Sequence, residues 1–133
     1  MSALHFERND QTTVNNISAD FVKFYYENLN KKNYNEILHL IKNYSMTSFD
    51  KNKFTGNQMS ELFKKYQEMN LTFTINDFDS LHSGARRINI IVTGIVHFLQ
   101  DDQLMQRNFT EYIHLASGKP GEFWIQTSIF KLI

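Results

Sequence analysis

The chain has 133 residues, of which 41% are apolar and 14% aromatic, and its formal net charge at pH 7 is zero. A neutral chain has no electrostatic footprint for nucleic acid or an anionic membrane, so we expect neither as a direct partner. The absence of cysteine excludes disulfides and thiolate chemistry, and the length predicts one domain with its own core.

Residues 1–14 are polar and aperiodic, and we expect a flexible N-terminal arm there, followed by a single domain over residues 15–133. Ser18 is predicted to be the N-cap of a long helix, with Asp20 in the first turn, where the helix dipole favours an anion. Apolar residues then recur at helical spacing, which indicates one buried face. They are Phe21, Val22, Tyr25, Tyr26 and Leu29.

The middle of the chain predicts two further helices and a pair of short strands. A short helix is expected near residues 34–43, because its apolar residues fall mostly on one side. Residues 44–50 alternate weakly and predict a strand, and residues 54–56 predict a short return after a polar turn. A third helix carries apolar residues at i, i+3, i+4 and i+7, namely Met59, Leu62, Phe63 and Tyr66.

The second half of the chain predicts strands, because β-branched and aromatic residues dominate it and turn-forming residues interrupt it. The expected strands cover residues 71–78, 87–98, 106–115 and 123–133, with loops at 99–105 and 117–121. Gly94 interrupts the second of these strands, and such a glycine often marks a bulge in a curved sheet.

Residues 87–98 have apolar side chains on both predicted faces. One face carries Ile88, Ile90, Val92, Val96 and Phe98, and the other carries Asn89, Ile91, Thr93, Ile95 and His97. The predicted fold class is therefore α+β, a cone in which a curved antiparallel sheet wraps around the long N-terminal helix and two further helices. The helices cover only one face, so we expect the outer face to contact another subunit.

No residue pattern indicates a metal site, a phosphate loop or a serine nucleophile. The five histidines include no HExxH arrangement, and His97 and His114 are candidates only for cross-strand neighbours. The glycines are few and scattered, and no Gly-x-Ser-x-Gly elbow is present.

Acid–base chemistry inside the cone would need a carboxylate and a tyrosine that converge there. Candidates for this role are Asp50, Glu111, Tyr25, Tyr26 and Tyr112. Each has a simpler structural interpretation, because the helix tyrosines belong to the apolar stripe, Asp50 lies at a turn, and Glu111 fits a partner contact.

Several segments resemble the nuclear transport factor 2-like family, in the family's order, from Ser18 to the end of the chain. They are Phe21-Val-Lys-Phe-Tyr-Tyr26, Phe54-Thr-Gly56, Phe98, Gln106-Arg-Asn-Phe109 and Trp124 with Ile129-Phe-Lys-Leu132. The resemblance implies the cone fold and dimerisation through the outer face of the sheet. It also implies four possible branches: import factors for GDP-bound Ran, small subunits of the mRNA export receptor, dimerising domains of stress-granule and deubiquitinase-cofactor proteins, and cavity enzymes.

The leading interpretation is the small subunit of the mRNA export receptor heterodimer. In that branch a basic residue just after the final aromatic residue pairs with a carboxylate of the large subunit, and Lys131 stands at that place. The interface residues that this resemblance implies are Lys131, Phe130, Phe109, Glu111 and Trp124. Lysine keeps the charge of the more common arginine but loses its bidentate geometry.

The first alternative is a homodimeric import factor for Ran-GDP, and the second is a cavity enzyme. For the import factor, the resemblance implies an acidic rim around an aromatic cavity, formed by Asp50, Asp101, Asp102 and Phe49. The family has a tryptophan where Phe49 stands and a longer acidic loop, so the chain departs from that pattern.

The expected partners follow from the leading interpretation. They are a large export receptor subunit with a matching domain and FG nucleoporins, bound directly or through that subunit; Ran-GDP belongs to the first alternative. We expect an obligate dimer without enzymatic activity, cofactor or metal, located in the nucleus and cytoplasm and associated with nuclear pores.

Overall fold

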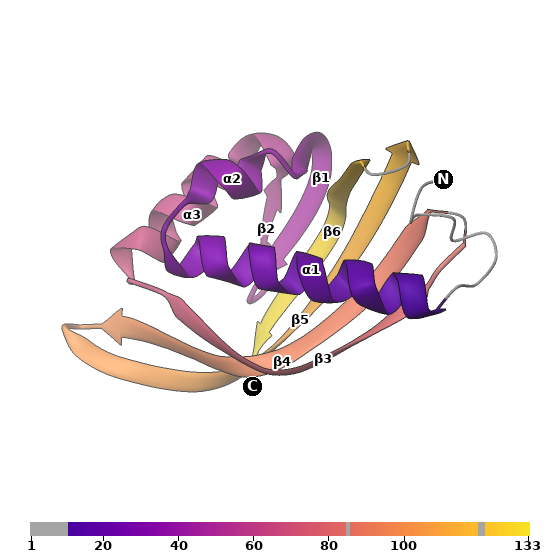
Figure 1. The fold of residues 1–133 in the computed structure, drawn as a ribbon. Coiled ribbons are helices and arrows are strands. Elements are labelled where there is room, and N and C mark those ends of the chain that lie inside the picture. The colour runs from indigo at the N-terminus through magenta and orange to yellow at the C-terminus, as the bar shows by residue number, and fades with distance from the viewer. Residues whose placement is uncertain (1–10, 85, 120–121) are drawn as a thin grey trace.

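The computed structural model describes residues 11–84, 86–119 and 122–133, and it places the helices on one side of a single curved sheet (Figure 1). The helices are α1 (Gln11–Asn30), α2 (Tyr34–Leu38), the 3₁₀ turn η2 (Gly56–Gln58) and α3 (Met59–Glu68). The strands are β1 (Ile41–Phe49), β2 (Asn52–Thr55), β3 (Thr72–His82), β4 (Arg87–Gln100), β5 (Gln103–Lys119) and β6 (Glu122–Leu132). Within these ranges, no helix is both long and apolar enough to cross a membrane.

The six strands follow the order β2-β1-β6-β5-β4-β3, which confirms the predicted cone. One pairing differs from the expected antiparallel sheet, because β1 and β6 run parallel. The chain leaves β1 through β2 and α3, forms β3, β4 and β5, and returns alongside β1 only with its last strand. A pairing between segments so distant in sequence has no local signal, since it depends on the whole topology.

Helix α1 starts earlier than the sequence pattern predicts. It begins at Gln11, so the last residues of the expected arm are helical, and residues 1–10 lie outside the described part of the chain. Ser18 is not an N-cap: it is fully buried in the middle of the helix, and its hydroxyl has no hydrogen-bond partner. Val14, seven residues before Phe21, adds two turns to the buried stripe and explains the longer helix.

Helix α2 is shorter than predicted because a strand takes over its expected last turns. The helix ends at Leu38, and β1 begins at Ile41. The carbonyl oxygen of Leu40 accepts a hydrogen bond of 2.7 Å from the backbone N–H of Ile125 in β6. Backbone groups satisfied by a neighbouring strand have no need of helical partners, so tertiary pairing overrides the local pattern.

The expected loop at residues 99–105 is a tight hairpin. Leu99 lies opposite Leu104 in the ladder, and only Asp101 and Asp102 form the turn. Both have positive φ angles, 51° and 62°, as a type I′ hairpin turn requires. The β4–β5 hairpin therefore continues past the rest of the sheet and projects from it in Figure 1.

Gly94 lies close to atoms of both neighbouring strands. A Cβ atom at this position would lie 2.2 Å from the carbonyl oxygen of Thr74 and 2.9 Å from the ring of Phe109. The neighbouring strand β3 shifts register between Ile75 and Asp77, so a bulge faces the glycine. The prediction that Gly94 marks a bulge is confirmed, and the physical reason is close backbone approach.

The free edge of β3 is covered by side chains. The side-chain amide of Asn30, the last residue of α1, donates to the carbonyl oxygen of Phe73 at 2.9 Å and accepts from its N–H at 2.7 Å. Farther along, the carboxylates of Asp77 and Asp79 accept hydrogen bonds from the N–H groups of Phe78 and Ser80. These contacts occupy backbone groups that would otherwise be available to another strand.

Candidate functional site

The sheet has an inner face against the helices and an outer face turned away from them. In β4, Ile88, Ile90, Val92 and Val96 are fully buried, whereas Ile91 is 48% exposed. This alternation confirms the division into two faces that the sequence predicts for residues 87–98. Helices cover only the inner face, so the outer face is the candidate site for a protein partner.

Residues paired directly across neighbouring strands point to the same face, so the register defines the outer face as three rows. The first row is Asp77, Thr93, Thr110 and Lys131. The second row is Asp79, Ile91, Tyr112, Ile129 and Ser48. The third row is Leu81, Asn89, His114, Thr127 and Met46.

Large apolar side chains lie exposed in the second and third rows. Ile129 is 45% exposed, Met46 46% and Leu81 65%. Around Ile91 and Leu81 the surface forms a shallow, mainly apolar hollow of about 120 Å³, to which Asp79, Asn89 and Tyr112 also contribute. Exposed aliphatic residues that follow one another across strands mark an interaction surface more strongly than scattered ones do.

A polar network lies beside this hollow. The side-chain oxygen of Asn89 accepts a hydrogen bond of 2.7 Å from the hydroxyl of Tyr112 and lies 2.6 Å from Nδ1 of His114. The other ring nitrogen, Nε2, lies 3.3 Å from a guanidinium nitrogen of Arg87. Partial burial, together with the charge of Arg87, lowers the pKa of His114 below its usual value. The imidazole is therefore neutral at pH 7.

The positions of the protons in this network follow from which groups donate hydrogen bonds and which accept them. A guanidinium only donates, so Nε2 of His114 accepts from Arg87. The neutral ring then carries its proton on Nδ1, and that N–H donates to the oxygen of Asn89. Because its oxygen receives two hydrogen bonds, the amide of Asn89 is held in one orientation.

Among the residues that the structure describes, the carboxyl group of Glu111 is buried on the inner face between the aromatic residues of the cone. Glu111 is 2% exposed and accepts hydrogen bonds from the hydroxyl of Tyr26 at 2.6 Å and from that of Tyr25 at 3.3 Å. Burial raises the pKa of Glu111 to about 7, and the tyrosine hydrogen bonds offset part of this effect. Burial and the nearby carboxylate raise the pKa values of both tyrosines well above the usual value.

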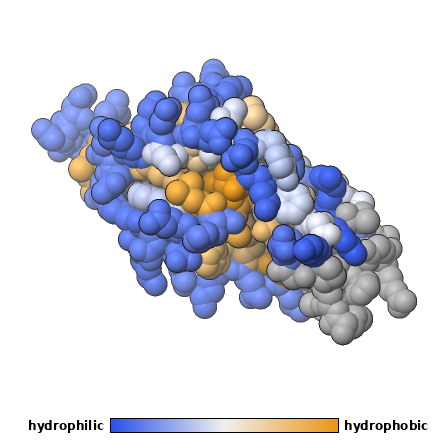
Figure 2. All heavy atoms as spheres, turned by 90° about the horizontal axis from the view of Figure 1, so that it is seen from above, coloured by the Kyte–Doolittle hydropathy of each residue, from blue (hydrophilic) through white to orange (hydrophobic). Residues whose placement is uncertain are grey.

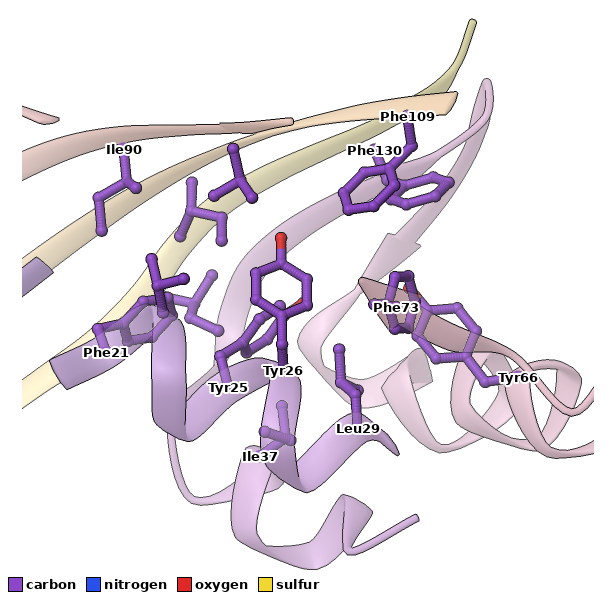
Figure 3. Packing of buried hydrophobic residues seen from close by; sticks show 14 of the residues in the cluster. Phe21, Tyr25, Tyr26, Leu29, Ile37, Tyr66, Phe73, Ile90, Phe109 and Phe130 are labelled. Atoms are coloured by element: carbon purple, nitrogen blue, oxygen red, sulfur yellow. The ribbon is translucent and has the colours of Figure 1, made fainter. Parts of the chain in front are cut away.

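Aromatic rings pack against one another on the same face of the sheet as this carboxyl group. Phe109 stacks on Phe130 with ring centres 5.1 Å apart, and Phe73 meets Phe109 edge to face at 5.6 Å. Figure 3 shows Tyr26 rising from α1 toward these rings, with Tyr66 beside Phe73. Of the residues suggested for acid–base chemistry, Glu111, Tyr25 and Tyr26 converge, and they do so among packed side chains of the core. Asp50 and Tyr112 do not join them.

A second apolar area lies on the opposite side of the molecule from the outer face. Figure 2 shows it in the centre of the view from above, framed by hydrophilic residues. Ile17, Leu38, Leu40 and Ile41 are partly buried apolar residues that pack against the core from α1, α2 and the segment that follows α2.

Three predicted interface residues lie on the inner face. The prediction that Phe109, Glu111 and Phe130 contact a partner through the outer face is wrong, because each is at most 2% exposed and packs against the α1 side of the sheet. The error lies in which residues of β5 and β6 were assigned to each face. A charged residue such as Glu111 suggests an outward position, but here the hydroxyl groups of Tyr25 and Tyr26 hydrogen-bond its carboxyl group on the inner face.

The other two predicted interface residues are accessible. Lys131 is exposed at the end of the first row, next to buried Phe130. Trp124 is half-buried; its indole N–H donates to Gln126 at 3.0 Å, and the ammonium group of Lys42 lies 5.4 Å from its ring centre. A partner contact by Lys131 or Trp124 stays a prediction.

The residues of the predicted acidic rim do not surround an open cavity. Phe49 stacks on Phe130 at 4.8 Å and closes that part of the cone. Asp50 lies in the β1–β2 turn with a positive φ of 46°, while Asp101 and Asp102 lie exposed at the tip of the projecting hairpin. Their role in binding stays a prediction.

Sequence reasoning missed the network of Arg87, Asn89, Tyr112 and His114. His114 pairs with Asn89, and His97 pairs with Gln106, so the suggested pairing of the two histidines is wrong. The missing information was the register, which the two-residue turn at Asp101 and Asp102 determines. In the described ranges, no cluster of three or more histidine, aspartate or glutamate side chains is arranged to hold a metal ion.

A model of the nuclear transport factor 2 domain matches residues 17–132. No curated protein matches the chain. The solved structure of nuclear transport factor 2 from Cryptosporidium parvum is 25% identical, with 94% of this chain and 97% of that chain covered and a TM-score of 0.72.

Two yeast structures are also similar. The yeast Ubp3-associated protein Bre5 is 17% identical, with 90% of this chain and 96% of that chain covered and a TM-score of 0.74. A chain in the complex of the yeast deubiquitinase Ubp3 with its cofactor Bre5 is 16% identical, with the same shares covered and a TM-score of 0.71. At this level of identity the two structures establish a common fold.

Proposed function

Because the chain belongs to the nuclear transport factor 2 domain family, we propose that it is a non-enzymatic adaptor of nucleocytoplasmic transport that binds a second protein through the outer face of its sheet. The observation that carries this proposal is the second row, in which exposed Ile91 and Ile129 flank Tyr112 across three strands. Buried aromatic and aliphatic residues supply most of the binding energy in protein interfaces, and this row has that composition.

The finer proposal is the small subunit of a heterodimeric mRNA export receptor. The chain would dock on the matching domain of the large subunit and so support its nucleoporin-binding site, in the nucleus and at the nuclear pore. Lys131 supports this choice, because it is exposed beside the second row and able to pair with a carboxylate of the partner. The neutral net charge also fits a chain that has no direct contact with RNA.

The packing inside the cone supports a non-enzymatic role. A cavity enzyme needs room for a substrate beside its acid or base. Here Glu111 is 2% exposed, its carboxyl group accepts hydrogen bonds from Tyr25 and Tyr26, and Phe109 and Phe130 stack on the same face of the sheet.

The proposal is tested with the charge-introducing variant Ile129→Lys. The tagged protein is purified from its native cells, partners are identified by mass spectrometry, and the identified large subunit is produced for binding measurements. We expect Ile129→Lys to weaken binding at least about a hundredfold, because a buried ammonium group would replace an apolar contact.

Leu104→Lys is the matched control, since Leu104 is 74% exposed at the hairpin tip and lies outside the three rows. The control variant should bind like the unmodified protein, and both variants should keep the native circular dichroism. If Ile129→Lys bound the partner normally, the outer face would not be the docking surface.

The second candidate function is a homodimeric import factor for Ran-GDP. One feature favours a homodimer: the first row has Asp77 at its β3 end and Lys131 at its β6 end, and two sheets packed face to face, with the two-fold axis along the strands between β4 and β5, would place these two ends opposite each other. Asp77 of one copy would then face Lys131 of the other.

This second function predicts a tight homodimer at nanomolar concentration and binding of Ran-GDP. That binding would disappear in a variant with Asp101→Asn and Asp102→Asn, measured by titration calorimetry. A weakly associating chain without affinity for Ran-GDP would rule it out in favour of the heterodimer.

A further inference from the structure

The polar network on the outer face depends on the protonation state of His114, which contacts both Arg87 and Asn89. Its neutral ring accepts a hydrogen bond from Arg87 at Nε2, at 3.3 Å, and its Nδ1–H donates to the side-chain oxygen of Asn89 at 2.6 Å. The hydroxyl of Tyr112 donates to the same oxygen at 2.7 Å. The four side chains come from the adjacent strands β4 and β5, so a change in the imidazole reaches both strands.

Protonation of the ring changes one of its two hydrogen bonds. Nδ1 carries a proton in both states, so its hydrogen bond to Asn89 persists. Nε2 becomes a donor, and it then faces a guanidinium group, which has no acceptor atom. Two donors that carry like charges repel each other at this distance, so the contact with Arg87 is lost. Arg87 is exposed, and its guanidinium group is therefore free to turn into the solvent.

The groups around His114 do not compensate for this loss. On its own strand, the hydroxyl of Tyr112 lies 3.5 Å from Nδ1, and on β6 the residue opposite His114 is the uncharged Thr127. The carboxylate of Asp79 lies on β3, and β4 separates that strand from β5. The helices cover the other face of the sheet. The charge of Arg87, together with partial burial, holds the pKa of His114 below its usual value of 6.5.

We propose that His114 is a proton-operated switch on the outer face, which holds Arg87 in the network while its ring is neutral and releases it when Nε2 is protonated. The neutral state presents one fixed cation, and the protonated state presents two, of which Arg87 is mobile. His114 lies in the third row, so the switch alters the charge of the proposed docking face. The switch belongs to the folded chain itself, and only its effect on association rests on the proposed docking function.

The first test titrates the ¹⁵N-labelled full-length chain from about pH 8 to about pH 5 and follows it by nuclear magnetic resonance. The imidazole ¹⁵N signals, assigned with the variant His114→Gln, report the tautomer and the protonation of the ring. We expect the Nδ1–H tautomer at the upper end of the titration and a midpoint below 6.5. Relaxation of the Arg87 Nε–H should show increased motion with the same midpoint.

Arg107 is the control for this measurement, because its Nε–H donates to the backbone oxygen of Ile133 and has no contact with the network. Its relaxation should not change over the titration. An Nε2–H tautomer at the upper end, or an Arg87 side chain that is equally mobile throughout, would overturn the switch.

Two glutamine variants test the coupling between the two charges. Arg87→Gln should raise the pKa of His114, since it removes a positive charge that disfavours the protonated ring. Lys131→Gln removes the same charge from the β6 end of the first row and should leave the pKa unchanged. If Arg87→Gln did not change the pKa of His114, the guanidinium group would not act on the ring and the proposal would be wrong.

Sedimentation velocity tests the consequence for association. Protonated His114 and mobile Arg87 both add charge that association through the outer face would have to desolvate. We expect self-association to weaken about threefold more on acidification in the unmodified protein than in His114→Gln. Other titrating groups are common to both proteins, so their effects cancel. Equal pH dependence would overturn the regulatory effect, whereas the docking function is tested separately by Ile129→Lys.

Discussion

Glu111 binds a proton inside the core at pH values below its raised pKa. Its pKa of about 7 in the folded protein compares with 4.5 for an unperturbed glutamate, and burial is the main cause. Between pH 4.5 and 7 the folded state therefore binds a proton that the unfolded state has lost. The free energy of unfolding contributed by this group falls as pH rises through that window, and it stays lower above pH 7.

We predict that Glu111→Gln removes this pH dependence. A neutral glutamine accepts the hydrogen bond from Tyr26 at any pH, so the variant avoids the cost of a buried charge. Relative to the variant, the unmodified protein should lose about 2–3 kcal/mol of unfolding free energy between pH 5 and 8. Urea unfolding of both proteins at the two pH values measures this difference.

The pKa shift of His114 changes the stability with pH in the opposite direction, but it does not affect the comparison of Glu111→Gln with the unmodified protein. Its pKa is lowered in the folded protein, so its contribution to stability is present above pH 6.5 and is lost as pH falls. Both proteins in the comparison contain His114, so its effect cancels. Identical pH profiles for the two proteins would mean that Glu111 is ionised at neutral pH in spite of its burial.

At the scale of single elements, Gly94 lets β3 and β5 approach β4 more closely than any other residue would. We predict that Gly94→Ala lowers the unfolding free energy by about 3 kcal/mol, because the new methyl group meets the carbonyl oxygen of Thr74 at 2.2 Å. Chemical denaturation followed by tryptophan fluorescence measures the change.

Gly118→Ala is the control for this substitution. The corresponding methyl group would lie 3.6 Å from the ring of Trp124, an ordinary contact, so the variant should stay within about 0.5 kcal/mol of the unmodified protein. Equal effects of both substitutions would show a general cost of alanine in these strands and remove the special role of Gly94.

The elements were predictable where their pattern was local. The α3 stripe at Met59, Leu62, Phe63 and Tyr66 is buried as helical spacing predicts, and the two faces of β4 follow strict alternation. The phase of β5 was not predictable, because Glu111 breaks the rule that charged residues lie outside. Only its two tyrosine partners on α1, some 85 residues earlier, make that position possible.

At the scale of the whole molecule, the helices cover one face of the sheet and leave aliphatic residues exposed on the other. The isolated chain should therefore associate weakly and reversibly, with an average mass in sedimentation velocity that rises with concentration. Ile91→Lys should keep the chain monomeric with unchanged circular dichroism. Association that persists in this variant would point to the apolar area of Figure 2 instead.

The cone fold was predictable from the order of helices and strands in the sequence, and the comparisons confirm it. The polar network on the outer face was not predictable, because Arg87, Asn89, Tyr112 and His114 are recognised as neighbours only when the ladder register is known. A surface formed by cross-strand neighbours is recognised only from the three-dimensional structure, whereas core residues are predictable from the period of hydrophobic residues in the sequence.

The sealed edge of β3 has a consequence for the behaviour of the protein in a crowded cell. A bare strand of this length would template the addition of strands from other chains, the route to fibrils. Asn30 occupies the place of a next strand at Phe73, so an incoming chain must first displace it. Strand addition at the β3 edge is therefore disfavoured, and we expect clusters formed at high concentration to dissolve on dilution.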